Sequence, residues 1–389
     1  MEKNKHLLIV SYGKYPNGNA GAVRQHTFAK LFMDCGYRVT VIGMGDSTDF
    51  KLRNYEGVDY VSFRKDPNTV SNRALNWLLY GRRLKHFLKE HPSEFTDILF
   101  IKSYFASVAN YIKRYARKHG IKLYHDSVEW YSPEEFSMGK LALGYRKNNH
   151  MNTHTVDKQF HVIAISKYLH EFFESRGIDT IRIPVIMDSE STKCEKKTDH
   201  DKLIITYAGR IGKKDYIANI INGFLLLSPE EQSKIELRLI GAKSAQVAEI
   251  TGISEAVLRE HAASVKCMGR VPREVVLDNL SETDFTILIR DASLRYAKAG
   301  FPTKVVESLM CSTPVICNLS SDLGDYLTDG YNAVIAEDMS EQKVCQAIRR
   351  ALELSREKRV EMQQNARKTA VEVFDYRNYL DEFGQWSNK

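Results

Sequence analysis

One stretch in the second half of the chain decides how the rest is interpreted: Ala299-Gly-Phe-Pro-Thr-Lys-Val-Val-Glu-Ser-Leu-Met-Cys-Ser-Thr-Pro-Val-Ile-Cys-Asn318. Pro302 suits the first position of a helix, because the N–H that it lacks would have no intrahelical partner there. Apolar residues then recur with helical spacing and predict a buried stripe of Val305, Val306, Leu309 and Met310. Ser312-Thr313-Pro314 ends the predicted helix, and residues 315–317 predict a short buried strand.

The start of this predicted helix is a candidate phosphate site. Free backbone N–H groups and the positive end of the helix dipole gather behind Ala299-Gly300-Phe301. Glu307 lies roughly 7 Å further along the helix, within reach of a ribose attached to that phosphate. The stretch therefore predicts a nucleoside diphosphate site. An amphipathic helix packed on a sheet explains the apolar stripe equally well, but not the polar face of Lys304, Glu307, Ser308 and Cys311.

The same stretch resembles the donor-binding signature of family-4 glycosyltransferases, which have the GT-B fold of two facing Rossmann-like domains. The usual pattern is Glu-x7-Glu, with Gly-Phe after the first Glu and Gly-Thr-Pro-Val at the end. This chain keeps Gly300-Phe301, Glu307 and Thr313-Pro314-Val315, and departs at Ala299 and Ser312. Its Phe-Pro-Thr-Lys variant resembles a branch associated with bacterial surface polysaccharides. The resemblance implies a donor site made by Gly300, Phe301, Thr303, Lys304 and Glu307, with Lys304 compensating for the missing first Glu.

Length and composition fit a two-domain globular protein. The chain has 389 residues, of which 43% are hydrophobic and 27% charged. No apolar run approaches the roughly 18 residues that a membrane-spanning helix needs. Six cysteines are scattered without a Cys-x-x-Cys pair, so neither a disulfide framework nor a zinc site is expected. We expect a cytoplasmic protein.

Charge is concentrated in the first half. Residues 1–185 hold 28 Lys and Arg against 18 Asp and Glu, a net charge of +10, whereas the remainder has a net charge of −3. Two predicted helices, around residues 72–91 and 111–118, interleave basic and aromatic side chains. This pattern suits a phosphorylated lipid, a membrane surface or a nucleic-acid backbone, and a solvated helix face is the plain alternative. Because no nucleic-acid-binding motif is present, we expect peripheral membrane association and no nucleic acid.

The first 43 residues predict a βαβ unit. Residues 7–12 form an apolar strand, a loop containing Gly18 and Gly21 opens a helix over 22–35, and residues 38–43 form the next strand. The glycines make the loop a candidate acceptor or phosphate site. The full G-x-G-x-x-G fingerprint is absent, which argues against a nicotinamide-dependent dehydrogenase.

His125 and Asp126 are the candidate catalytic residues. They end the predicted strand 122–126, where open α/β sheets place their ligand groups. Family-4 enzymes often carry His or His-Asp at this point, which implies a place near the transferred sugar. A His and a carboxylate are able to orient a hydroxyl or stabilise positive charge at the anomeric carbon. A histidine making structural hydrogen bonds is the alternative.

The second half repeats the α/β pattern after a polar linker over residues 188–201. The strand 203–208 leads into the basic turn Gly209-Arg-Ile-Gly-Lys-Lys-Asp215. Arg210 and Lys214 match the diphosphate-binding residues of the resembling family by order, although Lys213 is an equal choice. Arg290 follows another strand and is a further phosphate-binding candidate.

Together these features predict an α/β protein of the GT-B type. The expected parts are an acceptor-binding domain over residues 1–185, a donor-binding domain over 186–372 and a C-terminal helix over 373–389 that returns to the first domain. The resemblance implies transfer of a sugar, with retention and without a metal or other cofactor, from a nucleotide sugar to a glycan or lipid-linked acceptor. A non-catalytic nucleotide-sugar scaffold and a nucleotide-sugar epimerase of the same fold remain alternatives.

Overall fold

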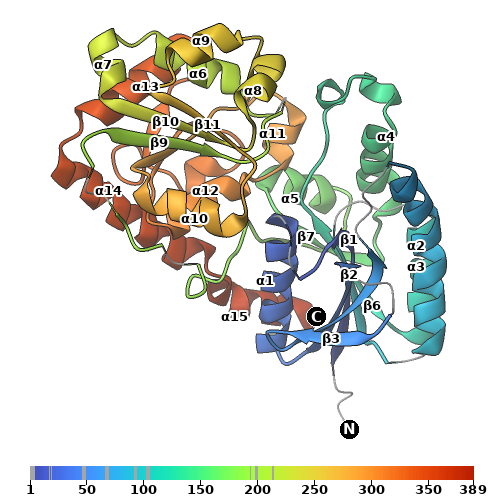
Figure 1. The fold of residues 1–389 in the computed structure, drawn as a ribbon. Helices are drawn as coiled ribbons and strands as arrows, with labels where there is room; N and C mark the ends of the chain where they lie inside the picture. The colour runs from blue at the N-terminus through green and yellow to red at the C-terminus, as the bar shows by residue number, and fades with distance from the viewer. Residues whose placement is uncertain are drawn as a thin grey trace. The chain divides into compact units, whose positions relative to one another are not determined.

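The chain forms two compact units in the computed structural model, each built on its own β-sheet (Figure 1). One unit comprises Met1–Met187 and Tyr376–Lys389, and the other comprises Asp188–Asp375. The structure describes residues 5–16, 18, 20–45, 50–65, 70–91, 94–101, 106–192, 194–197, 200–212 and 214–389. Within these ranges, no helix is both long enough and apolar enough to cross a bilayer.

The first unit is built on an eight-stranded sheet with the order β3-β4-β2-β1-β5-β6-β7-β8, in which only β3 runs antiparallel to its neighbour. The strands are β1 (His6–Lys14), β2 (Arg38–Gly45), β3 (Leu52–Tyr55), β4 (Val58–Lys65), β5 (Asp97–Ile101), β6 (Lys122–Ser127), β7 (Phe160–Ala164) and β8 (Thr180–Arg182). β1 lies at the centre, with Leu7 opposite Val39 on one side and Asp97 on the other. Its apolar run is buried on both faces, as a central parallel strand requires.

The helices of this unit are α1 (Ala20–Asp34), α2 (Val70–Glu90), α3 (Ala106–His119), α4 (Leu143–His150), α5 (Lys167–Glu174) and α15 (Leu380–Ser387). α15 belongs to the C-terminal tail and packs into the core of the first unit. Phe383 meets Phe32 of α1 with ring centroids 4.7 Å apart, and Trp386 meets Tyr124 of β6 at 5.6 Å. The Trp386 indole also donates to Asp179 over 3.0 Å, so the tail is fixed by both packing and a hydrogen bond.

The second unit is built on a six-stranded parallel sheet with the order β11-β10-β9-β12-β13-β14. The strands are β9 (Leu203–Ala208), β10 (Ile235–Ile240), β11 (Val265–Gly269), β12 (Phe285–Leu288), β13 (Val315–Asn318) and β14 (Ala333–Ala336). The helices are α6 (Ile217–Leu225), α7 (Pro229–Ser233), α8 (Ser244–Thr251), α9 (Glu255–Glu260), α10 (Arg273–Glu282), α11 (Arg295–Ala299), α12 (Thr303–Met310), α13 (Glu341–Glu353) and α14 (Arg356–Thr369).

α12 is the helix predicted from the opening stretch. Its apolar stripe is fully buried, which confirms the periodicity. The predicted polar face is wrong for Ser308 and Cys311, because both are also fully buried. The Ser308 hydroxyl is satisfied by the Thr286 hydroxyl at 2.6 Å and the Thr313 carbonyl at 2.7 Å. A short polar side chain with such partners is accepted in a core.

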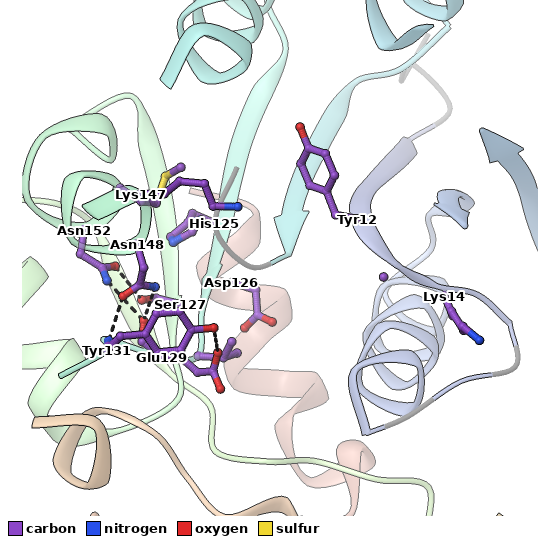
Figure 2. A pocket seen from close by; sticks show the side chains of 13 residues that line it. Tyr12, Lys14, His125, Asp126, Ser127, Glu129, Tyr131, Lys147, Asn148 and Asn152 are labelled. Atoms are coloured by element: carbon purple, nitrogen blue, oxygen red, sulfur yellow. Dashed lines mark hydrogen bonds between the residues drawn. The ribbon is translucent and has the colours of Figure 1, made fainter. Parts of the chain in front are cut away.

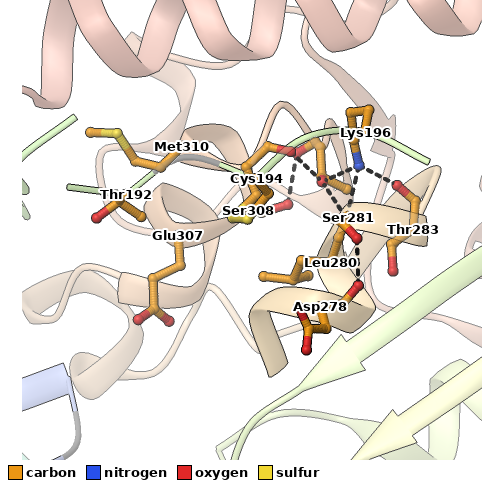
Figure 3. The surroundings of a disulfide bond; sticks show 12 residues. Thr192, Cys194, Lys196, Asp278, Leu280, Ser281, Thr283, Glu307, Ser308 and Met310 are labelled. Carbon is orange, nitrogen blue, oxygen red and sulfur yellow. Dashed lines mark hydrogen bonds between the residues drawn. A yellow bond between two sulfur atoms is a disulfide. The ribbon is translucent and has the colours of Figure 1, made fainter. Parts of the chain in front are cut away.

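The segment predicted as a linker, residues 188–201, is bonded to the rest of the second unit through Cys194 and Lys196 (Figure 3). Cys194 forms a disulfide with Cys311, which directly follows α12, although 117 residues separate them. The expectation that the cysteines form no disulfide is therefore wrong for this pair. Two residues further on, the Lys196 ammonium donates to the carbonyls of Leu280 and Thr283 and to the Thr313 hydroxyl over 2.9, 2.5 and 2.7 Å. These three acceptors match the three N–H bonds of the ammonium.

We expect Lys196→Met to destabilise the second unit by about 3 kcal/mol, because two carbonyls and a hydroxyl would lose their donor in a largely buried site. Urea denaturation of the full chain measures this difference. The matched control is Lys197→Met, since that neighbouring side chain is exposed and its backbone N–H bond to Ser281 is kept. Equal stability of the two variants would contradict a structural role for Lys196.

Candidate functional site

A pocket of about 380 Å³ opens in the first unit, at the carboxyl ends of β1 and β6 (Figure 2). Parallel strands place their carboxyl ends at one edge, and α/β sheets bind ligands there. The wall is completed by the segment after β6 and by α4 with the turn that follows it. The lining residues are Tyr12, Gly13, Lys14, His125, Asp126, Ser127, Val128, Glu129, Tyr131, Lys147, Asn148, Met151 and Asn152.

Asp126 lines this pocket but is held by an arginine that the sequence analysis did not select. The Arg24 guanidinium of α1 binds both carboxylate oxygens, with Nε–Oδ2 of 2.9 Å and Nη2–Oδ1 of 2.7 Å. Its Nη1 also donates to the Pro184 carbonyl over 2.9 Å. Both partners of this ion pair are buried. This bidentate contact holds the Asp126 carboxylate in position, and a catalytic role for Asp126 stays a prediction.

His125 is buried at the carboxyl end of β6. Burial lowers its pKa to about 3, and aromatic rings of Phe160 and Phe173 lie 6.3 and 6.5 Å from it. A group that stays neutral at physiological pH orients a hydroxyl by hydrogen bonding and does not carry positive charge. His125 lines the pocket, and its predicted role in orienting a hydroxyl or stabilising charge at the anomeric carbon stays a prediction.

The far wall of the pocket is a hydrogen-bonded network that no sequence motif predicts. The Tyr131 hydroxyl donates to the Glu129 carboxylate over 2.7 Å, and the Asn148 side chain of α4 bridges the two residues. Burial, followed by the Glu129 charge, raises the pKa of Tyr131 well above its usual range. Lys147 of α4 points its ammonium toward Tyr12, 5.8 Å from the ring centroid, and burial lowers its pKa to about 8.

The predicted glycine loop contributes less than expected. β1 extends to Lys14, so Gly13 and Lys14 line the pocket in place of Gly18 and Gly21. Gly13 packs so closely on Gln25 that a Cβ there would lie 2.8 Å from its amide nitrogen. Gly18 precedes α1 and Gly21 lies within it, and neither is among the pocket residues.

In the second unit, Asp215 is the centre of a buried charge cluster. Its Oδ1 accepts from Arg290 over 2.8 Å, and its Oδ2 accepts from Lys304 of α12 and from the Tyr207 hydroxyl, the latter over 2.7 Å. Burial by itself would raise the pKa of Asp215, but Lys304 and Arg290 outweigh burial and hold it well below its usual range. The sequence predicts the two cations as donor-site residues but not the carboxylate that positions them.

The basic turn after β9 lies against this cluster. Gly209 approaches Lys304 so closely that a Cβ there would lie 2.6 Å from its Cε. Arg210 follows with an exposed side chain, while its carbonyl lies 3.2 Å from the Tyr207 hydroxyl. The Lys214 carbonyl accepts from the Tyr296 hydroxyl of α11 over 2.8 Å. Arg210 and Lys214 are thus brought to the Lys304 region, and Lys213 lies outside the described residues.

The remaining residues predicted to bind the donor already contact other parts of the second unit. The Gly300 N–H donates to the Tyr296 carbonyl over 3.0 Å, so the prediction that this amide binds phosphate is wrong. Phe301 is buried against Tyr326 and Phe374, and Thr303 begins α12. Glu307 is half-buried and accepts from Arg273 of α10 over 2.7 Å. Its carboxylate stays near the surface, and a ribose would have to share it with Arg273.

No group of three His, Cys, Asp or Glu side chains in the described part of the chain is arranged to hold a metal ion.

Comparisons with known proteins add the enzyme class. Residues 188–369 match the family model of glycosyl transferases group 1. An uncharacterized glycosyltransferase of Methanocaldococcus jannaschii is 21% identical over 279 residues, which cover 69% of this chain and 68% of that protein.

Solved structures share the fold over nearly the whole chain. Sucrose-phosphate synthase from Thermosynechococcus elongatus is similar with a TM-score of 0.72 and 12% identity, over 99% of this chain and 98% of that one. The HepE protein of Anabaena in complex with UDP is similar with a TM-score of 0.70 and 16% identity, over 99% of both chains. These likenesses confirm the fold class predicted from the sequence. The chain thus has the GT-B fold, and its residues 188–369 form a group 1 glycosyl transferase domain.

Proposed function

We propose that this protein transfers a sugar from a nucleoside diphosphate sugar to a hydroxyl of a lipid-linked glycan, in the manner of bacterial surface-polysaccharide enzymes. The observation that carries the proposal is the cluster of Lys304 and Arg290 around Asp215, beside the exposed Arg210. Two fixed cations share one carboxylate, which leaves a positive excess where a diphosphate needs it. The UDP bound by the HepE protein supports UDP as the first nucleotide to test.

In this proposal the second unit binds the donor. Arg210 and Lys214 contact the diphosphate, and Asp215 keeps Lys304 and Arg290 in place as the leaving group gains charge. Positioned cations stabilise developing negative charge in the same way as a bound metal ion, so the proposed reaction uses no metal. Glu307 binds the ribose hydroxyls, exchanging part of its contact with Arg273.

The pocket of the first unit receives the acceptor. His125 and the Glu129–Tyr131 pair offer hydrogen-bond partners to sugar hydroxyls, and Arg24 holds the Asp126 carboxylate in place beside them. Reaction with retention is the outcome implied by the family-4 resemblance. The basic character of residues 1–185 supports work at the inner face of a membrane, where a lipid-linked acceptor would lie.

The decisive experiment incubates the protein with UDP-sugars and an extract containing lipid-linked glycans, and analyses the products. Transfer that requires the acceptor supports the proposal. A changed nucleotide sugar formed without acceptor would instead identify an epimerase, and nucleotide-sugar binding with neither hydrolysis nor transfer would identify a scaffold.

Arg210→Ala should weaken UDP binding about tenfold, since an exposed guanidinium that contacts a diphosphate contributes about 1.4 kcal/mol or more. Thermal shift with increasing UDP measures the affinity, because a ligand of the folded state raises the apparent stability. Lys358→Ala, which removes an exposed cation paired with Glu361, serves as the matched control. Unchanged UDP affinity of the Arg210 variant would remove this residue from the donor site.

Glu307→Ala should raise the donor KM about tenfold, because both ribose hydroxyls lose their acceptor. Arg273→Ala removes the ion-pair partner and keeps the carboxylate, so its donor KM should change much less. Steady-state kinetics on both variants makes the comparison. Equal increases in KM would show that Glu307 acts through its ion pair and not on the ribose.

A further inference from the structure

A short segment that follows β6 and ends at the first residue of α4 exposes three large apolar side chains. Met138, Leu141 and Leu143 are 65%, 69% and 74% exposed, the three highest fractions for large hydrophobic residues in the described part of the chain. Isolated exposed apolar residues are ordinary on protein surfaces. Three within six residues form a patch of the kind that marks an interaction site. We call residues 136–143 the apolar loop.

The apolar loop is held in a defined shape. Two short 3₁₀ helices, Pro133–Glu135 and Gly139–Leu141, shape it, and the Gly139 and Ala142 N–H groups donate to the carbonyls of Phe136 and Gly139 over 3.0 and 3.2 Å. The Phe136 ring packs against Gly144, where a Cβ would lie only 3.0 Å from it. This anchoring keeps the three apolar side chains in solvent, so their exposure is built into the fold.

The apolar loop and the chain that follows it are basic, whereas Glu134 and Glu135 directly precede the loop. No Asp or Glu occurs from residue 136 to residue 156, whereas Lys140, Arg146 and Lys147 lie in that segment. Lys140 and Arg146 are exposed beside the apolar side chains. Apolar residues flanked by cations match an anionic lipid surface, where side chains enter the interface and Lys and Arg remain at the headgroups.

We propose that the apolar loop docks on an anionic lipid bilayer, with Met138, Leu141 and Leu143 entering the interface and Lys140 and Arg146 contacting the headgroups. The apolar loop leads directly into α4, whose Lys147 and Asn148 line the pocket of the first unit. Docking would therefore hold this pocket at the bilayer surface. The link to a lipid-linked acceptor rests on the proposed function, but binding to lipid does not.

The test is co-sedimentation of the full chain with vesicles of phosphatidylcholine alone or mixed with phosphatidylglycerol. The unchanged protein should bind the mixed vesicles, and the triple variant Met138→Ser, Leu141→Ser, Leu143→Ser should bind them at least about tenfold more weakly. The double variant Lys140→Gln, Arg146→Gln should also bind about tenfold more weakly and lose its preference for the anionic lipid. The matched control is Leu226→Ser, Ile250→Ser, Val360→Ser, which changes exposed apolar residues of the second unit.

Thermal shift with UDP on the same proteins separates this inference from the proposed function. Retained UDP binding by the triple variant, together with lost vesicle binding, supports the docking surface. Vesicle binding without UDP binding or sugar transfer by the unchanged protein would leave the docking surface standing while the proposed function fails. Equal vesicle binding by the triple variant and its control would overturn the inference. The inference would also be overturned if the unchanged protein did not bind vesicles but formed dimers that the triple variant does not form.

Discussion

Buried carboxylates at the carboxyl edge of a parallel sheet organise both units. Asp126 ends β6 and is bound by Arg24 of α1, and Asp215 follows β9 and is bound by Lys304 of α12 and by Arg290. A charge in such a place is tolerated only with a well-placed partner, because desolvation is costly and an orphaned partner is costlier. In each unit the ion pair therefore fixes how a helix meets the edge of the sheet that carries the candidate site.

Much of the architecture is accessible from the sequence because it depends on local pattern. The buried run at residues 7–10 marks a central strand, and the apolar stripe of α12 is found by its helical period. Ser312, which stands where the resembling family usually has Gly, has a left-handed φ of 54°. The burial of Ser308 and Cys311 cannot be predicted from a local pattern. Both depend on partners from elsewhere in the chain: Thr286 for the hydroxyl, and Cys194 for the thiol.

The candidate sites show the same limit. The sequence identifies His125 and Arg290 by residue type and by position at the end of a strand, and the resemblance identifies Lys304 at the start of α12. The sequence does not predict that His125 is desolvated, that the Gly300 N–H donates to the Tyr296 carbonyl, or that Arg24 forms an ion pair with Asp126. The first and third of these facts come from contacts between segments far apart in the chain, and the second comes from the end of α11. Lys147 and Asn148 were missed for the same reason, since their helix carries no recognisable signature.

In the proposed donor site, Asp215 would favour anion binding even though it is itself an anion, because it orders the two cations of the cluster. Without it, Lys304 and Arg290 would repel each other and turn toward solvent, and each would have to be ordered anew when a ligand arrived. With it, the two cations share one negative charge, keep a net positive charge of one, and stay within fixed distances of the Gly209–Arg210 turn. A diphosphate entering beside Arg210 then meets cations whose ordering occurred during folding, which lowers the entropy lost on binding and raises the stabilisation of a departing nucleotide.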